Sequence, residues 1–296
     1  MDWLIEFPSL SRGELRVFRK AIDDGFREFT QQYGEGLESF FDPLLSFLIW
    51  SEKTLLASPW PLVILVIAGL GWFGSRSWKI VIGIVLSLAA IGYMGMWEDT
   101  MKTLSIITVC TMVSIFIGIP LGIVMARSNR LQAIITPILD IMQTMPSFVY
   151  LIPVVMLLGI GKVPGMIAVI IYALPPIVRL TNLGIRQVDV DVVEAANAFG
   201  CTAWQKLVNV QMPLALPSIF AGVNQTIMMS LSMVVIASMI GVTGLGQPVL
   251  KAITNQYFSL GLMNGLAIVA IAIIFDRVSQ RYGLRIQKHR QGGHNV

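Results

Sequence analysis

The sequence predicts an all-α polytopic membrane protein with about seven spanning helices, and three observations support this fold class. Of its 296 residues, 55% are hydrophobic and only 13% are charged, and the mean hydropathy is +0.74. Soluble domains carry roughly 25% charged residues, so this composition excludes an ordinary soluble domain. Apolar runs of about 20 residues, long enough to cross the hydrocarbon core, recur along the chain. Basic residues gather in alternate connecting loops, which gives the spans a direction.

The first segment, residues 1–54, is expected to form an amphipathic, interfacial helical tail. Val17, Phe18 and Ile22 recur at helical spacing with charged residues between them. A helix with one apolar and one charged face lies on a membrane surface, and this is the favoured interpretation. An extra or re-entrant span around residues 44–50 is the alternative, and it would change the parity of the topology.

Seven apolar segments follow this tail. Residues 55–97 are expected to hold two accessory spanning helices, and residues 98–284 the five of a core domain. The fourth segment contains Pro146 and Pro153, so its first part is expected to be a separate short helix. Residues 285–296 are expected to form a flexible tail. The seven segments are Leu55–Gly74, Trp78–Trp97, Leu104–Ala126, Ile134–Ile160, Val163–Ile185, Leu214–Gly241 and Leu260–Phe275.

The distribution of charge sets the orientation. With the N-terminus outside, the inside segments hold twelve Lys and Arg residues, and the outside loops after the first span hold three. Cytoplasmic loops carry the excess, so the arrangement is N-out and C-in. The N-terminal tail holds six more basic residues, which a long translocated segment tolerates. The twelve are Arg76, Lys79, Arg127, Arg130, Arg179, Arg186, Lys206, Arg277, Arg281, Arg285, Lys288 and Arg290; the three are Lys102, Lys162 and Lys251.

The predicted spans contain few groups that do chemistry. Asp140, Arg179 and Asp276 lie near the ends of predicted helices, and we interpret them as interfacial or structural charges. The phosphate-binding pattern G-x-x-x-x-G-K-[ST] does not occur, and no catalytic constellation is present within the predicted spans. The chain is therefore expected to be no enzyme and to hold no cofactor or metal. Energy for transport is then expected to come from another chain.

A stand-alone secondary transporter or channel for a small organic cation is the alternative from a different class. That class predicts buried ionisable residues within the spans or inverted internal repeats. Neither is found in the sequence, which favours a subunit that depends on partners.

The long connection between the fifth and sixth spans has signs of ordered structure. Asp191 and Glu194 have the spacing of a capping box that starts a helix, and Thr202 and Gln205 repeat that spacing. Gly200 lies between the two predicted helices, where glycine readily takes the left-handed conformation that ends a helix. The second helix is expected to run to about residue 209.

The same loop carries residues suited to contact another surface. Ala195 and Ala196 permit close approach, and Phe199 and Trp204 offer apolar anchors of the kind that contribute most to interfaces. On these residues alone, two interpretations stay open. One is an interfacial connector, and the other is a docking platform for a cytoplasmic partner.

Three parts of the loop resemble the EAA signature of binding-protein-dependent ABC importer permeases. They are Glu-Ala-Ala at residues 194–196, Gly200, and Val-x-Met-Pro at residues 210–213, all at the spacing of that family. The family has Ile and Leu where this chain has Val210 and Met212. The resemblance implies a type I ABC importer transmembrane domain, in which the cytoplasmic loop 186–213 couples to a separate ATPase. The residues expected at this contact are Glu194, Ala195, Ala196, Phe199, Gly200 and Trp204.

Three longer stretches narrow the resemblance to permeases for glycine betaine, proline betaine and choline. They are "PILDIMQTMPSFVYLIPVVMLLGIGKVPG", "LPPIVRLTNLGI" and "MVVIASMIGVTGLG". The implied solute is a quaternary-ammonium or methylated-amine osmolyte: glycine betaine, proline betaine, choline, carnitine or trimethylamine N-oxide. Because aromatic rings attract methylated cations, residues expected along the path are Phe148, Tyr150 and Tyr172, with the polar Asn224 and Gln225.

The same resemblance implies the partners and the location. A second copy of the chain, two ABC ATPase subunits that bind ATP and Mg²⁺, and a periplasmic or lipid-anchored substrate-binding protein are expected. The surroundings are the lipid of the bacterial cytoplasmic (inner) membrane. Nucleic acid is not an expected partner, because the basic residues behind the pI of 9.2 are spread between apolar segments.

Overall fold

The computed structural model describes residues 10–291, with side chains described to residue 283, and this part of the chain is almost entirely helical. Short 3₁₀ turns at Ser147–Tyr150 and Ser238–Ile240 and a π-helical turn at Leu207–Gln211 interrupt the α-helices. The helices are α1 (Arg12–Ala57), α2 (Trp60–Ser75), α3 (Trp78–Tyr93), α4 (Trp97–Arg127), α5 (Asn129–Thr144), α6 (Leu151–Leu158), α7 (Lys162–Arg186), α8 (Val190–Ala198), α9 (Ala203–Lys206), α10 (Met212–Ala237), α11 (Gly246–Asn255) and α12 (Phe258–Gln291).

The number of membrane-crossing helices agrees with the prediction of about seven. Within the described residues, four helices are long and apolar enough to span, and two bent pairs raise the number to six. The short apolar helix α3 is the seventh candidate. The bent pairs are α1 with α2, at 113°, and α5 with the segment Ser147–Leu158, at 111°.

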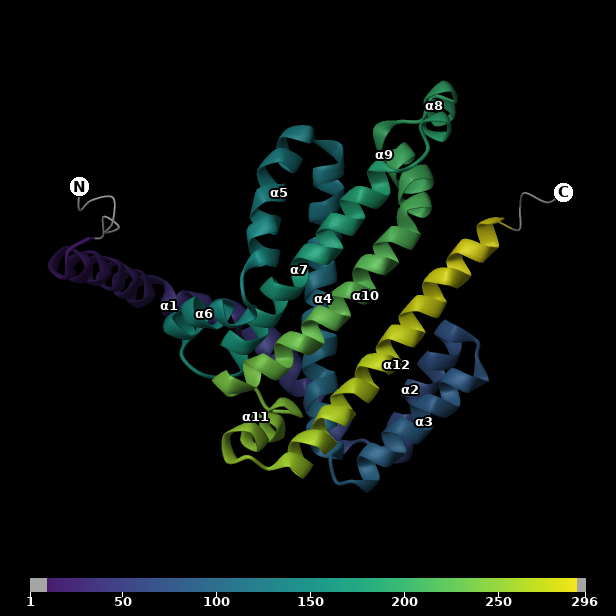
Figure 1. Cartoon of the computed structure of the whole chain (residues 1–296). Coiled ribbons are helices and arrows are strands. Elements are labelled where there is room, and N and C mark those ends of the chain that lie inside the picture. Colours follow the sequence, from purple (N-terminus) through teal and green to yellow (C-terminus); the bar gives the residue numbers. More distant parts are fainter. Residues whose placement is uncertain (1–9, 292–296) are drawn as a thin grey trace, which may run out of the picture.

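Helix α7 is the centre of the bundle and packs between α4 and α10 (Figure 1). In its most apolar stretch 67% of the residues are buried, against 17% in α12, which lies at the edge. Glycines let α4 approach α7 closely. A Cβ added to Gly118 would lie 2.3 Å from Ile177, and one added to Gly122 would lie 2.6 Å from Thr181. Small residues are the usual means of tight packing between membrane helices.

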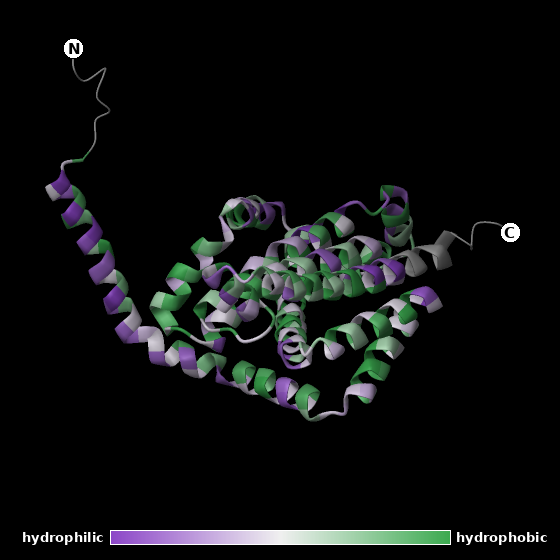
Figure 2. Ribbon diagram, turned by 60° about the horizontal axis from the view of Figure 1, so that its bottom comes forward, coloured by the Kyte–Doolittle hydropathy of each residue, from purple (hydrophilic) through white to green (hydrophobic). Residues whose placement is uncertain are grey.

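Helix α1 is one continuous helix of 46 residues, which begins within the predicted helical tail and continues to Ala57. A capping box between Ser11 and Glu14 starts it, and Pro43 lies inside it. Its first part projects from the bundle with charged and apolar faces (Figure 2). Its last part packs into the core: Leu48 is 1% exposed, and its carbonyl oxygen accepts a hydrogen bond from Ser105 Oγ at 3.4 Å.

A partly buried ion pair also attaches the end of α1 to the bundle. Lys162 Nζ, at the first residue of α7, lies 2.7 Å from Glu52 Oε2. The residues around 44–50 are therefore enclosed by protein on one side in this structure.

Helices α2 and α3 form an antiparallel pair beside α12, where Ile64 and Ala68 pack against Ile84 and Leu88. Each has 16 residues, or about 24 Å of helix. That is shorter than the hydrocarbon core, which is about 30 Å thick. The two helices in the region of the predicted accessory spans, residues 55–97, are therefore short for membrane-spanning helices.

Two predicted boundaries differ from the structure. The fourth span breaks after Thr144, as predicted, but Pro153 lies in the first turn of α6, where proline does not disrupt a helix. The tail predicted from residue 285 is helical up to Gln291, because α12 continues through it. Residues 292–296 lie outside the described part of the chain.

Candidate functional site

The loop between α7 and α10 extends beyond the ends of the long helices. Helices α8 and α9 lie at one end of the molecule, at the top of Figure 1, together with the start of α5 and the end of α12. The basic residues Arg127, Arg130 and Arg186 are at helix ends there. The positions therefore agree with the predicted placement of this loop on the positively charged side.

Helix α8 starts two residues earlier than the predicted capping box requires. Asp189 is the N-cap, and its side chain accepts a hydrogen bond from the Asp191 amide at 2.9 Å. The capping box predicted between Asp191 and Glu194 is therefore wrong. Val188, next to the cap, is 8% exposed, and its burial fixes where the chain leaves α7. Glu194 lies in the middle of α8 and is exposed, without a hydrogen-bond partner among the described residues.

Gly200 ends α8 as predicted. Its φ is +75°, in the left-handed region that favours glycine. The Gly200 amide donates to the carbonyl oxygen of Asn197 at 2.9 Å, and the Cys201 amide donates to that of Ala196 at 3.1 Å. These bonds satisfy carbonyl groups that a helix end leaves without partners. The turn they form sets the angle between α8 and the chain that follows.

Helix α9 opens with the predicted capping box. Thr202 Oγ1 accepts from the Gln205 amide at 3.3 Å, and Gln205 Oε1 accepts from the Thr202 amide at 2.9 Å. The prediction that this helix ends near residue 209 is wrong. The helix passes through the π-helical turn into α10, and the resulting helix Ala203–Ile240 has 38 residues. Pro213 is the second residue of α10, which directly follows the π-helical turn.

Two arginines fix the base of this loop to the membrane helices. Arg127, the last residue of α4, donates from Nη2 to the Ala203 carbonyl oxygen at 2.9 Å and lies 5.9 Å from the centre of the Trp204 ring. Arg186, the last residue of α7, donates to Asn129 Oδ1 at 2.7 Å and to the Met125 carbonyl oxygen at 2.9 Å.

The arginines therefore join the ends of α4, α5, α7 and α9. Within the loop, Lys206 Nζ donates to Asn197 Oδ1 at 2.9 Å, which ties α9 back to α8. None of these contacts follows from local spacing. The available sequence signal was only that the basic residues of this side cluster at helix ends.

The outer surface of the loop is apolar and uncovered. Phe199 is 88% exposed and Trp204 is 66% exposed. Exposed apolar groups gathered on a loop mark a surface that a partner covers. Ala195 is exposed, but Ala196 is only 7% exposed, so it packs inside the loop and does not face outward. Further exposed apolar side chains of this surface are Val190, Val192 and Val208.

The five residues predicted along a path fall into two groups. Tyr150 and Tyr172 are in edge-to-face contact with ring centres 5.6 Å apart, and the Tyr150 hydroxyl donates to the Met142 carbonyl oxygen. Phe148 is in the same bend between α5 and α6 and is 54% exposed. The aromatic residues therefore gather where the fourth span breaks.

The polar pair lies elsewhere, between α10 and α12. Asn224 Nδ2 donates to Asp276 Oδ1 at 3.0 Å, and Asn224 Oδ1 is buried without a partner among the described residues. Gln225 lines a cavity of about 520 Å³ in this region, with Phe220 and Gln280. The structure does not bring this pair next to the aromatic group within one chain.

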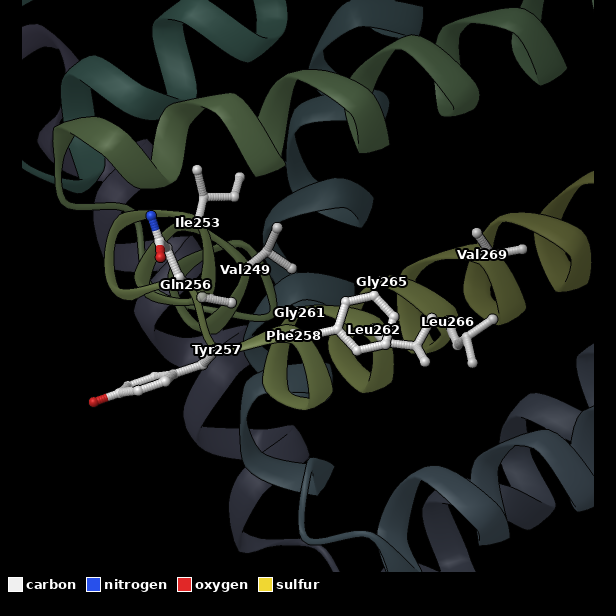
Figure 3. A pocket seen from close by; sticks show the side chains of 11 residues that line it. Val249, Ile253, Gln256, Tyr257, Phe258, Gly261, Leu262, Gly265, Leu266 and Val269 are labelled. Atoms are coloured by element: carbon white, nitrogen blue, oxygen red, sulfur yellow. The ribbon is translucent and has the colours of Figure 1, made fainter.

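A second cavity, of about 610 Å³, lies where α11 meets α12 (Figure 3). Its lining includes Val249, Phe258 and Leu266, and no charged residue borders it. Such a lining suits hydrocarbon more than a charged solute. Among residues 10–291, no group of three or more His, Cys, Asp or Glu side chains is placed to hold a metal ion.

Comparisons with known proteins agree on one family. The family model described as "Binding-protein-dependent transport system inner membrane component" matches residues 118–288. The glycine betaine/carnitine transport permease protein GbuB of Listeria monocytogenes is 48% identical over 229 residues, which cover 77% of this chain and 81% of GbuB. The glycine betaine/proline betaine transport system permease protein ProW of Escherichia coli is 51% identical over 232 residues, which cover 78% of this chain and 65% of ProW.

The fold also resembles a solved transporter. A chain of the MetNI methionine ABC transporter, in an inward facing conformation, superposes with a TM-score of 0.57. The match covers 62% of this chain and 93% of that chain, at 20% sequence identity. At this identity the likeness concerns the fold alone, and it agrees with the predicted type I ABC importer transmembrane domain.

Proposed function

Because the chain belongs to the family of binding-protein-dependent transport system inner membrane components, we propose that it carries a methylated osmolyte across the membrane and that its cytoplasmic loop receives the driving force. The protein is the permease subunit of an ABC importer and not an enzyme. It lies in the bacterial inner membrane and works with ATPase and substrate-binding partners.

The coupling role of the loop rests on its exposed surface and its rigid attachment. Phe199 and Trp204 are uncovered at the end of the molecule, and Glu194 has no partner among the described residues. A movement of α9 passes directly into α10 because the two form one helix of 38 residues. Arg127 carries the same movement to α4 through its hydrogen bond to the Ala203 carbonyl oxygen.

We propose that Glu194, Ala195, Phe199, Gly200 and Trp204 form the surface seated on the ATPase. Ala196 supports this surface from inside, since it is buried within the loop. When two ATPase subunits close on ATP and Mg²⁺, they would pull the loops of two permease copies together. The path between the copies then opens to the outside, where the binding protein delivers solute.

The solute class follows from the family relatives. GbuB and ProW carry glycine betaine in their names, with carnitine and proline betaine respectively. We propose glycine betaine as the first solute to test, with proline betaine, carnitine, choline and trimethylamine N-oxide as competitors. Tyr150, Tyr172 and Phe148 at the break of the fourth span would offer aromatic faces to the methylated nitrogen.

Reconstituted transport tests this function. The chain is placed in proteoliposomes with its ATPase and binding protein, and uptake of radiolabelled glycine betaine is measured with ATP inside the vesicles. Uptake that needs ATP and the binding protein is expected. Uptake that runs without ATP on an ion gradient would support the stand-alone secondary transporter and overturn the proposal.

Two substitutions test the coupling surface. Glu194→Lys reverses a charge at the proposed contact, and Gly200→Pro prevents the left-handed turn. Both are expected to reduce ATPase co-purification and uptake. Glu38→Lys, at an exposed position of α1, is the matched control and is expected to change neither. Wild-type ATPase binding and uptake in both loop variants would show that the loop is not the coupling surface.

A further inference from the structure

Helix α5, which is part of a candidate membrane span, has a stripe of polar residues along one face. Gln132, Thr136, Asp140 and Gln143 are spaced four, four and three residues apart, so they share one face. The neighbouring face is packed: Leu139 is 2% exposed and forms a cluster with Met125 and Val178. The stripe is therefore held at a fixed orientation, beside the contact of α5 with α4 and α7.

A third face of α5 is apolar and uncovered. Ile134, Ile138 and Ile141 are 62%, 52% and 59% exposed, as expected for side chains that contact lipid. The polar stripe lies on another side of the helix, so α5 separates a lipid-facing side from a polar one. A spanning helix divided in this way borders water or another polar surface.

An ion pair lies in the second half of this stripe, toward the bend that follows α5. Arg179 of α7 pairs with Asp140 of α5 through Nη2 and Oδ1. Asp140 is eleven residues from the start of α5 at Asn129, which places it about 16 Å along the helix axis. Arg179 is seven residues, or about 10 Å, from the end of α7 at Arg186, so the pair lies between the cytoplasmic helix ends and the bend after α5. The sequence alone favours interfacial or structural charges near helix ends for these residues, and it does not predict that they pair with each other.

The two charges are incompletely enclosed by this chain. The Asp140 side chain is 55% exposed and the Arg179 side chain 35% exposed. Arg179 Nε is buried without a hydrogen-bond partner among the described residues. Charged groups at this depth do not face hydrocarbon, because that costs several kcal/mol, so the open side of the pair faces a water-filled path.

We infer that Asp140 and Arg179 contact the transported solute as it crosses the membrane, each at one of the two opposite charges of a zwitterion. This inference rests on the proposed function. It places a pair of opposite charges in the translocation path of the importer. Arg179 donates hydrogen bonds to the carboxylate of a betaine, and Asp140 attracts its methylated ammonium group. In the empty path the two side chains pair with each other, so neither charge is left alone.

The surroundings of the pair fit the same solute. Tyr172 is seven residues before Arg179 on α7, which places it on the same face about 10 Å further along. Its ring pairs with Tyr150 at the break between α5 and α6. A methylated nitrogen that enters from the outside can therefore meet an aromatic face before it reaches Asp140. Broken helices at the middle of the membrane are a common setting for transported solutes.

Uptake by charge variants tests the inference. Asp140→Asn and Arg179→Gln are assayed in the reconstituted importer with radiolabelled glycine betaine. Each is expected to reduce uptake roughly tenfold or more, while ATP hydrolysis stimulated by the loaded binding protein continues. Glu98→Gln, which removes the exposed pair with Lys102, is the control and is expected to transport normally. Normal uptake by both Asp140 and Arg179 variants would overturn the inference.

The exchanged double variant Asp140→Arg with Arg179→Asp separates solute contact from helix packing. A pair that only holds α5 against α7 is restored by the exchange, and uptake would return, which overturns the inference. A pair that binds an oriented solute stays defective, which is the expected result. Loss of uptake in the wild-type importer would instead count against the proposed function itself, so the two failures are distinguishable.

Thiol labelling checks the water-filled path without any assumption about the solute. Thr136→Cys, Gln143→Cys and Ile138→Cys are made in a chain whose Cys110 and Cys201 are replaced by alanine. A membrane-impermeant cationic methanethiosulfonate is expected to label positions 136 and 143 from the cytoplasmic side and to spare position 138. Spared positions 136 and 143 would mean that the stripe is covered, for example by a second copy, and would overturn the inference.

Discussion

Arg127, at the last residue of α4, donates a hydrogen bond of 2.9 Å to the backbone carbonyl of Ala203, and its guanidinium lies 5.9 Å from the centre of the Trp204 ring. A helix of the membrane bundle is thereby fastened to the first turn of α9. Because α9 continues into α10, one side chain joins two long helices at the point where the ATPase is proposed to act.

Arg127→Gln is expected to weaken coupling between ATP hydrolysis and transport. Hydrogen bonds from charged groups contribute about 1.5–3 kcal/mol, and exposure lowers this figure. We expect solute moved per ATP hydrolysed to fall roughly five- to tenfold while the ATPase still binds. Parallel measurement of uptake and phosphate release checks this. Arg130→Gln, three residues away at an exposed position, is the control. Equal ratios in the two variants would contradict the expectation.

Substitution of Gly200 is expected to act through backbone conformation alone. Its φ is +75°, and a Cβ there would meet no atom within 4 Å. A left-handed conformation costs other residues about 1–2 kcal/mol, and asparagine less. Affinity for the ATPase should therefore fall in the order Gly, Asn, Ala, Val, with Gly200→Ala about 5- to 30-fold weaker. Titration with purified ATPase measures the order, and an Ala variant as tight as the Asn variant would refute it.

Gly122→Ala is expected to destabilise the bundle. The added Cβ would lie 2.6 Å from Thr181 Cβ and 2.7 Å from the carbonyl oxygen of Val178, which is backbone and cannot move aside. Overpacking of this kind costs about 1–3 kcal/mol. Thermal unfolding in detergent should show a lower midpoint. Gly83→Ala is the matched control, because a Cβ there meets nothing within 4 Å. If Gly83→Ala lowered the unfolding midpoint as much as Gly122→Ala, overpacking would not explain the loss of stability.

The ion pair between Glu52 and Lys162 is expected to hold α1 on the bundle. The two side chains are 14% and 30% exposed, so removal of one partner leaves the other charge poorly solvated. Lys162→Met should cost about 1–3 kcal/mol and should make α1 more sensitive to limited proteolysis.

The double variant Lys162→Met with Glu52→Gln should recover part of that loss, because neither charge is then left alone. If the loss of stability in the double variant equals the sum of the losses in the two single variants, the two side chains do not interact directly. Glu98→Gln is the exposed comparison, and it should cost less than about 1 kcal/mol because Glu98 is 70% exposed.

Local signals in the sequence predicted local structure well. The Thr202–Gln205 capping box and the stop at Gly200 need only neighbouring residues, and both are present. The predicted N-cap of α8 was wrong by two residues, because Asp189 and Asp191 are equally good N-cap residues when judged by spacing alone. The choice between them depends on the burial of Val188 against other parts of the chain, which spacing does not report.

Features that depend on distant residues were not predictable in the same way. The pair Asp140–Arg179 joins residues 39 apart in sequence, and it requires α5 to lie against α7 before the chain bends at 111°. The continuity of α9 with α10 requires a π-helical turn, which inserts one extra residue and has no simple sequence signature. Arg127 and Arg186 were identified as inside charges, but their acceptors on other helices, two backbone carbonyls and the Asn129 amide oxygen, were not predictable from the sequence.

The attachment of α1 has a consequence for how the protein is made. Glu52 and Lys162 are 110 residues apart, so ribosomes that add about 5–20 residues per second need roughly 5–20 seconds between them. During that interval the Glu52 carboxylate has no Lys162 to pair with, whereas Ser105, which donates to the Leu48 carbonyl oxygen, is made about halfway through. Docking of α1 through this pair therefore awaits synthesis of the start of α7, long after α1 itself is made.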